Sequence, residues 1–197
     1  MEKQLIISIG REYGSAGHEI AEKVAKDLNL PLYDRHLLDK LAEEKGMNLK
    51  DIEKYDEKPR NLFLSRNVNG FSNSFADTVA EMQFNFIREK AESGESFVVV
   101  GRCSEVVLAG NEALVSVFIL GNKQTKVEHV KKKYNLSENE ALQKMARHDR
   151  KRKAYHNAHS KISWGDSRGY DLCINSSRLG VEKTAELIEQ YAKAKTN

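Results

Sequence analysis

Short apolar runs alternate with amphipathic stretches along this chain. The β-branched run at residues 5–9 predicts a strand that is covered on both faces of a parallel sheet. Ile20, Val24 and Leu28 follow the spacing of one helical face. Strands that alternate with helices predict an α/β fold with right-handed crossovers. Further apolar runs predict strands at residues 30–33, 97–100, 114–120 and 170–174.

Helical patterns occupy much of the remaining sequence. Ser137 is a residue type that caps helix N-termini, and Glu140 follows three residues later, so this pair predicts a capping box. Ser93 and Gly94 are expected to end the helix before them. Apolar spacing predicts helices at residues 36–44, 75–91, 125–134, 138–158 and 181–194.

Three glycines, Gly10, Gly14 and Gly17, separate the first predicted strand from the first helix. Glycine adopts positive φ and lets a ligand approach the main chain, and the free N–H groups at a helix N-terminus favour an anion. This arrangement predicts a phosphate-binding turn. An isolated glycine-rich turn can equally serve only the close packing of strand and helix.

The turn departs from the phosphate-binding pattern G-x-x-x-x-G-K-[ST] at three positions. Glu12 replaces the first glycine, His18 the lysine, and Glu19 the serine or threonine. Histidine is mostly neutral near pH 7, so His18 is a weaker and pH-dependent substitute for lysine. Glu19 is best interpreted as a favourable charge at the helix N-terminus.

Composition narrows the class of protein. The 197 residues suffice for one domain with an inserted part, and Lys+Arg 32 against Asp+Glu 29 leaves a net charge of +3, which does not indicate nucleic-acid binding. Cys103 and Cys173 lie far apart and suit reduced thiols rather than a disulfide or zinc site. We find neither a signal peptide nor an apolar run of about 18 residues, so we expect a cytoplasmic protein that does not span a membrane.

Five sequence motifs occur in a fixed order: SIGREYGSAGHEIA, LPLYD, VVVGR, DRKRKAYH and WGDSRGYDLCINSS. Together they resemble the cytidylate kinase-like family, a branch of the P-loop nucleoside monophosphate (NMP) kinases. The resemblance implies a P-loop NTPase-type parallel sheet of about five strands flanked by helices, in one domain over residues 1–197. Its core would comprise residues 1–45, 94–135 and 170–197, with a helical NMP-binding insertion at about 46–93 and an Arg-rich lid at about 144–169.

Family chemistry implies transfer of the ATP γ-phosphoryl group to a nucleoside monophosphate or related small acceptor, with Mg²⁺. Arg150 would be the most direct phosphoryl clamp, assisted by Arg147, Arg152 and His18. The neighbouring Asp149 would orient an arginine or act on substrate. The acceptor would be bound by Asp34, Arg35 and Arg102, although Cys103 stands where the family has an aspartate. The resemblance places the nucleotide phosphates on Gly14, Ser15, Ala16, Gly17, His18 and Glu19.

A second function class stays open, a module that binds a nucleotide or another polyanion, RNA included, without turnover. The missing lysine and Ser/Thr of the turn favour this module, whereas the ordered lid arginines favour the enzyme, and we favour the enzyme. A basic run such as residues 144–153 is usually only a solvated helix face. His156 and His159 lack the partners of a zinc site. The expected partners are nucleotides; the sequence does not set the oligomeric state.

Overall fold

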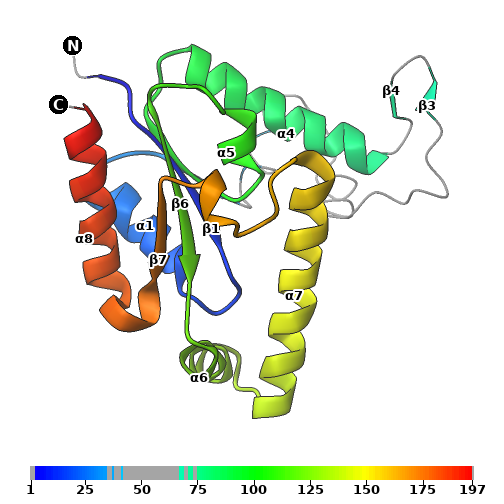
Figure 1. Ribbon diagram of the computed structural model, residues 1–197, viewed down its shortest axis with the longest axis vertical. Coiled ribbons are helices and arrows are strands. Elements are labelled where there is room, and N and C mark those ends of the chain that lie inside the picture. Colours follow the sequence, from blue (N-terminus) through cyan, green and yellow to red (C-terminus); the bar gives the residue numbers. More distant parts are fainter. Residues whose placement is uncertain are drawn as a thin grey trace.

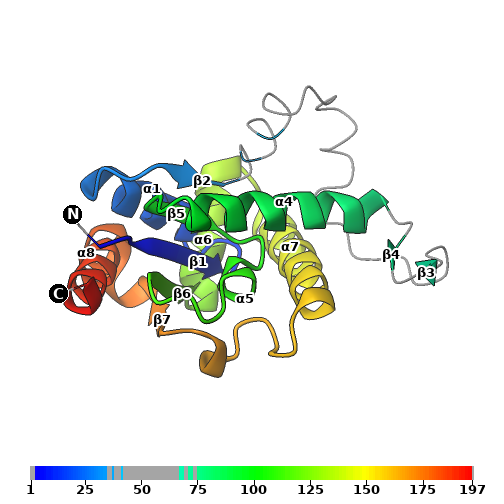
Figure 2. The ribbon, with the colours of Figure 1, turned by 90° about the horizontal axis from the view of Figure 1, so that it is seen from above.

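The computed structural model describes residues 3–34, 37, 41, 67–68, 71–72 and 75–196. Its centre is a five-stranded parallel sheet in the order β2-β5-β1-β6-β7, of which Figure 1 labels β1, β6 and β7 and Figure 2 labels every strand. The alternation of strands and helices therefore led to the correct fold class. The strands are β1 (Ile6–Arg11), β2 (Leu32–Tyr33), β5 (Phe97–Val100), β6 (Leu114–Leu120) and β7 (Leu172–Asn175).

Helices cover both faces of the sheet, and the side chains of β1 divide between them (Figure 2). Ile7 and Ile9 pack with α1 (Gly17–Asp27) and α8 (Ser176–Thr196). Ile6 faces the other way and packs with α4 (Phe75–Glu92). This alternation follows from the period of two in a strand, and it explains why the strand sequences are apolar throughout.

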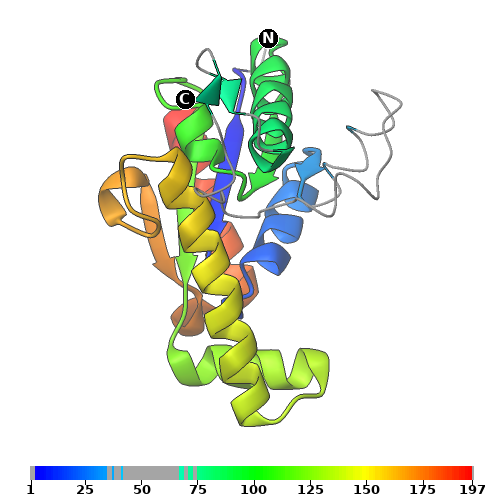
Figure 3. The same cartoon turned by 90° about the vertical axis from the view of Figure 1, so that its right-hand side faces the viewer.

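Helices α6 (Lys123–Tyr134) and α7 (Glu138–His159) follow β6 at the carboxyl edge of the sheet. α7 crosses α6 at a steep angle and then rises beside the sheet (Figure 3). Val127 and Val130 of α6 pack there with Ala141 and Met145 of α7. None of the helices that the structure describes is long and apolar enough to cross a membrane. The bounds are α5 (Ser104–Val107), α6 (Lys123–Tyr134), α7 (Glu138–His159), η1 (Ser167–Gly169) and the small antiparallel pair β3 (Asn67–Val68) and β4 (Phe71–Ser72).

Most predicted elements agree with the structure. The strands at 97–100 and 114–120 are confirmed, and Ser137 forms the predicted capping box with Glu140. The last helix begins earlier than predicted, because helical backbone at 176–179 continues past a kink at Gly180, where φ is 74°. Apart from Leu37 and Leu41, the predicted helix at 36–44 lies outside the described residues, as does much of the predicted insertion.

Candidate functional site

The glycine loop, residues 10–17, connects β1 to α1 at the carboxyl edge of the sheet. Gly14 has φ of 85°, and a Cβ atom there would lie 2.9 Å from Val130 Cγ2. A Cβ atom at Gly17 would lie 2.5 Å from Arg11 Cβ. Ala16 also has a left-handed backbone, with φ of 58°. Gly14 is therefore required by its backbone and by close packing against α6, and Gly17 by close packing against Arg11, whether or not a ligand binds.

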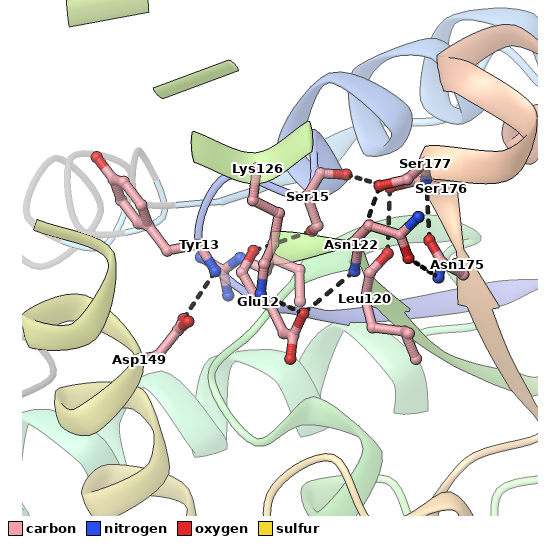
Figure 4. A network of polar contacts seen from close by, with 12 residues as sticks. Glu12, Tyr13, Ser15, Leu120, Asn122, Lys126, Asp149, Asn175, Ser176 and Ser177 are labelled. Atoms are coloured by element: carbon pink, nitrogen blue, oxygen red, sulfur yellow. Dashed lines mark hydrogen bonds and ion pairs between the residues drawn. The ribbon is translucent and has the colours of Figure 1, made fainter. Parts of the chain in front are cut away.

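Polar contacts fix the shape of this loop (Figure 4). Ser15 Oγ donates to Glu12 O at 2.9 Å, and Ser176 Oγ donates to Ser15 O at 2.7 Å. The Glu12 carboxylate accepts hydrogen bonds from Lys126 Nζ at 2.7 Å and from Gly121 N at 3.1 Å. A glutamate is thus tolerated in place of the first glycine because a buried lysine from α6 neutralises it.

A second lysine of α6 compensates for Glu19. The Glu19 carboxylate lies 2.7 Å from Lys133 Nζ and 3.3 Å from His129 Nε2. Burial would raise the pKa of Glu19, but the hydrogen bond from Lys133 and the nearby His129 outweigh it and hold that pKa below its usual value. Both acidic departures from the phosphate-binding pattern are therefore neutralised by α6.

The histidine that replaces the lysine of the phosphate-binding pattern lies between two carboxylates. His18 Nε2 is 3.4 Å from Asp34 Oδ2 and 3.3 Å from Glu22 Oε1. Asp34 is 6% exposed and follows β2. The structure thus places His18, which was predicted to bind the ATP phosphates, next to Asp34, which was predicted to bind the phosphoryl acceptor. Arg35 lies outside the described residues.

Helix α7 contacts the glycine loop through Tyr13. The Tyr13 backbone N–H donates to Asp149 Oδ1 at 2.7 Å, and its ring stacks on His148 with centroids 4.4 Å apart (Figure 4 draws the hydrogen bond). Arg152 Nη1 donates to Arg11 O at 3.3 Å. Burial, and then the charges of Arg152 and other basic residues of α7, lower the pKa of His148 to about 4. Burial raises the pKa of Asp149.

Between the glycine loop, α6 and α7 lies a cleft of about 670 Å³, which we call the central cleft. Its walls include Gly14, Ala16, Gly17, His18 and Glu19, together with Asp34. Together with Arg102 and Arg152, eight of the predicted site residues therefore line one cleft. The cationic groups that line it come from four elements or their ends: Arg11, Arg102, Lys133, Lys144 and Arg152.

The predicted arginines separate into two groups. Arg102 and Arg152 line the central cleft, and Arg102 is only 3% exposed. Gly101, Arg102 and Cys103 all have positive φ, and a Cβ atom at Gly101 would collide with the Arg11 guanidinium. Arg147 and Arg150 are exposed and do not line the cleft, because α7 continues unbroken and turns them to another face.

Several residues of the cleft carried no assigned role in the sequence. Arg11 lies inside the first of the five motifs, two residues after the predicted strand at 5–9, and this place near the carboxyl end of a strand was the sequence signal for a role in binding. Lys133 and His148 line the cleft, and Lys126 contacts the glycine loop beside it. None of the three belongs to a motif, and only tertiary structure brings them to the loop.

Comparison with known proteins identifies the family. The model of the cytidylate kinase-like family matches residues 6–178. The chain belongs to the cytidylate kinase-like family. No curated protein matches this chain. An uncharacterized protein from Eubacterium ventriosum is 38% identical, with a TM-score of 0.78, over 97% of this chain and 99% of that one.

Other solved structures show the same fold at low sequence identity. Shikimate kinase from Bacteroides thetaiotaomicron is 13% identical, with a TM-score of 0.56, over 96% of this chain and 98% of that chain. Shikimate kinase from Acinetobacter baumannii is 12% identical, with a TM-score of 0.54, over 98% and 95%. This cytidylate kinase-like protein thus has the fold of P-loop kinases.

Proposed function

We propose that this cytidylate kinase-like protein is a nucleotide-binding phosphotransferase that transfers the ATP γ-phosphoryl group to a nucleoside monophosphate or related small acceptor. The observation that supports it best is the central cleft, where a glycine loop meets arginines from β1, the end of β5 and α7. Phosphoryl transfer depends on positioning and on neutralising negative oxygens, and such a cleft suits both. Family membership supports kinase chemistry in general terms.

On the donor side, residues 14–18 would hold the ATP phosphates through backbone N–H groups at the start of α1. His18 would contribute imidazole hydrogen bonding in place of the usual lysine, with Asp34 and Glu22 orienting its ring. On the acceptor side, Arg102 and Asp34 line the cleft, and Arg35 stays a proposal from the resemblance. The acceptor oxygen would attack the γ-phosphorus while ADP departs.

Arg152 is the lid arginine that the cleft geometry favours as the phosphoryl clamp. Arg147 and Arg150 stay proposed clamps, but α7 would have to rotate to bring them to the cleft. Mg²⁺ bound with ATP would neutralise charge on the phosphate oxygens. Among the described residues, no cluster of three or more His, Cys, Asp or Glu side chains could hold a metal ion. The phosphates and water would therefore be its main ligands.

The alternative is nucleotide binding without turnover. It is favoured by the Glu12–Lys126 and Glu19–Lys133 pairs, because they engage two lysines beside the loop that could otherwise bind phosphate. We also propose a cytoplasmic location, which rests on two cysteines that form no disulfide and on the resemblance.

The deciding experiment is a coupled ADP-release assay with ATP and Mg²⁺ against a panel of nucleoside monophosphates. We expect acceptor-dependent turnover, and a loss of about 100-fold or more in kcat for Arg152→Ala if its guanidinium stabilises the transition state. Lys153→Ala, which removes a positive charge from an exposed position of α7, is the matched control and should change kcat by less than about threefold. Nucleotide binding without ADP release in the wild type would support the alternative.

A further inference from the structure

The glycine loop lacks a lysine at the position where phosphate-binding loops have one. That lysine reaches the β and γ phosphates of a nucleotide. His18 stands there instead, and its Nε2 lies 3.3 Å from Glu22 Oε1 and 3.4 Å from Asp34 Oδ2. A proton on this imidazole would be shared with two carboxylates, so His18 brings no net positive charge to the loop. The charge that attracts a polyphosphate must therefore come from another residue.

The two lysines that contact the loop are also paired with carboxylates. Lys126 Nζ lies 2.7 Å from Glu12 Oε2, and Lys133 Nζ lies 2.7 Å from Glu19 Oε1. Each lysine compensates for an acidic residue of the loop itself. Neither pair therefore leaves a net positive charge for a ligand.

Arg11 is the cationic residue that belongs to the glycine loop. It is the last residue of β1, and it lines the central cleft together with Gly14 and Gly17. A guanidinium keeps its charge throughout the physiological pH range, and its planar set of N–H donors matches the oxygens of a phosphate. A permanent positive charge thus lies at the loop, on the strand side rather than the helix side.

Two glycines make room for the Arg11 side chain. A Cβ atom at Gly17 would lie 2.5 Å from Arg11 Cβ and 3.0 Å from Arg11 Cγ, so the stem of the side chain packs against the first residue of α1. A Cβ atom at Gly101 would collide with Arg11 Nη1, so the guanidinium lies against the turn that follows β5. Close packing at both ends fixes the place of this charge before any ligand binds, which is the arrangement that stabilises negative oxygens most effectively.

We propose that Arg11 supplies the charge that the phosphate-binding pattern assigns to lysine, and that its guanidinium binds the β and γ phosphates of ATP. This inference rests on the proposed function and deepens it, because it names the residue that makes the loop select a polyphosphate. His18 keeps its hydrogen-bonding role, so charge and hydrogen bonding are divided between two residues. Arg152 Nη1 donates to Arg11 O at 3.3 Å, and this contact holds a second guanidinium next to the first.

Calorimetric titration with a non-hydrolysable ATP analogue, in the absence of an acceptor, tests the proposal. Arg11→Gln should weaken binding by about tenfold or more, the range expected for a hydrogen bond between charged groups. Arg11→Lys keeps the charge and should weaken binding by less than about threefold. Arg168→Gln is the matched control, because its side chain is 84% exposed and lies outside the cleft, and it should change the affinity by less than about twofold.

The salt dependence of the affinity separates a charge from a packing role. Added salt screens an ion pair with phosphate, so the wild-type affinity should fall as the ionic strength rises. The fall should be smaller in Arg11→Gln and close to the wild type in Arg11→Lys. If Arg11→Gln does not fold, Arg11→Met keeps an unbranched stem against Gly17 and takes its place, with the same expected losses.

Wild-type affinity and wild-type salt dependence in Arg11→Gln would overturn the proposal. Equal losses of affinity in Arg11→Gln and Arg11→Lys would also overturn it, because they would show that packing of the side chain and not its charge matters. The calorimetry reports ATP binding alone, so failure here is distinct from failure of the proposed phosphotransfer, which the ADP-release assay reports.

Discussion

Asp149→Ala should make this protein bind ATP more tightly. In the structure Asp149 Oδ1 accepts the Tyr13 N–H at 2.7 Å, so a carboxylate occupies a backbone donor at the start of the glycine loop. A phosphate that uses this donor must first displace Asp149. The same carboxylate lies 3.8 Å from Arg152 Nη1, and its removal would also release this guanidinium for phosphate.

The size of the gain follows from the hydrogen bond that ATP no longer has to break. A hydrogen bond to a charged group contributes about 1.5–3 kcal/mol. Because the Asp149 side chain is 24% exposed, we take the lower value. About 1.5 kcal/mol corresponds to roughly tenfold in affinity.

Isothermal titration with a non-hydrolysable ATP analogue at fixed ionic strength measures this gain. Glu138→Ala is the control, because it removes the same charge from the exposed start of α7 and should change the affinity by less than about twofold. Affinity that is unchanged or weaker in Asp149→Ala would refute the reasoning and would indicate that Asp149 supports the binding geometry.

Two further predictions concern stability. Gly14→Ala places a Cβ atom 2.9 Å from Val130 Cγ2 at a φ of 85°, so we expect denaturant unfolding to show about 2–4 kcal/mol of destabilisation. Gly110→Ala is the control, because Gly110 has the same φ of 85° but lies in open space, and it should cost only about 1 kcal/mol. Equal losses of stability in the two variants would contradict the packing argument. The pKa of His148 falls to about 4 in the folded state, so between about pH 6.5 and 4 the unfolded chain binds a proton that the folded chain does not, and stability should fall as pH falls. His148→Phe keeps a ring against Tyr13 and should flatten this part of the pH profile, whereas an unchanged slope would show that another group is responsible.

Local sequence patterns predicted most of the fold. The strands β5 and β6 are buried on both faces, so nearly every residue in them is apolar. Such runs predict a strand without any knowledge of the strands that pair with it. The capping box of Ser137 and Glu140 is also local, since both partners lie within one helical turn. The bounds of α8 were less predictable, because Gly180 kinks the helix where its usual effect is to end one.

The site was predictable only in part, because its decisive contacts join distant residues. Glu12 and Lys126 are 114 positions apart, and nothing near either residue signals the pair. The basic run on α7 suggested arginines in general, but which of them faces the cleft depends on how the helix packs on α6. The side chains of Glu105 on α5 and His156 on α7 also meet, at 2.7 Å, although they are 51 positions apart. Nothing in the sequence predicted this contact.

Phosphorus NMR of the wild-type protein with ATP, Mg²⁺ and a nucleoside monophosphate tests phosphotransfer most directly, because it separates transfer from hydrolysis. The account predicts a new phosphorylated acceptor that grows in step with ADP and is reduced about 100-fold by Arg152→Ala. ADP that accumulates with inorganic phosphate alone, or spectra that do not change while ATP binds, would contradict it.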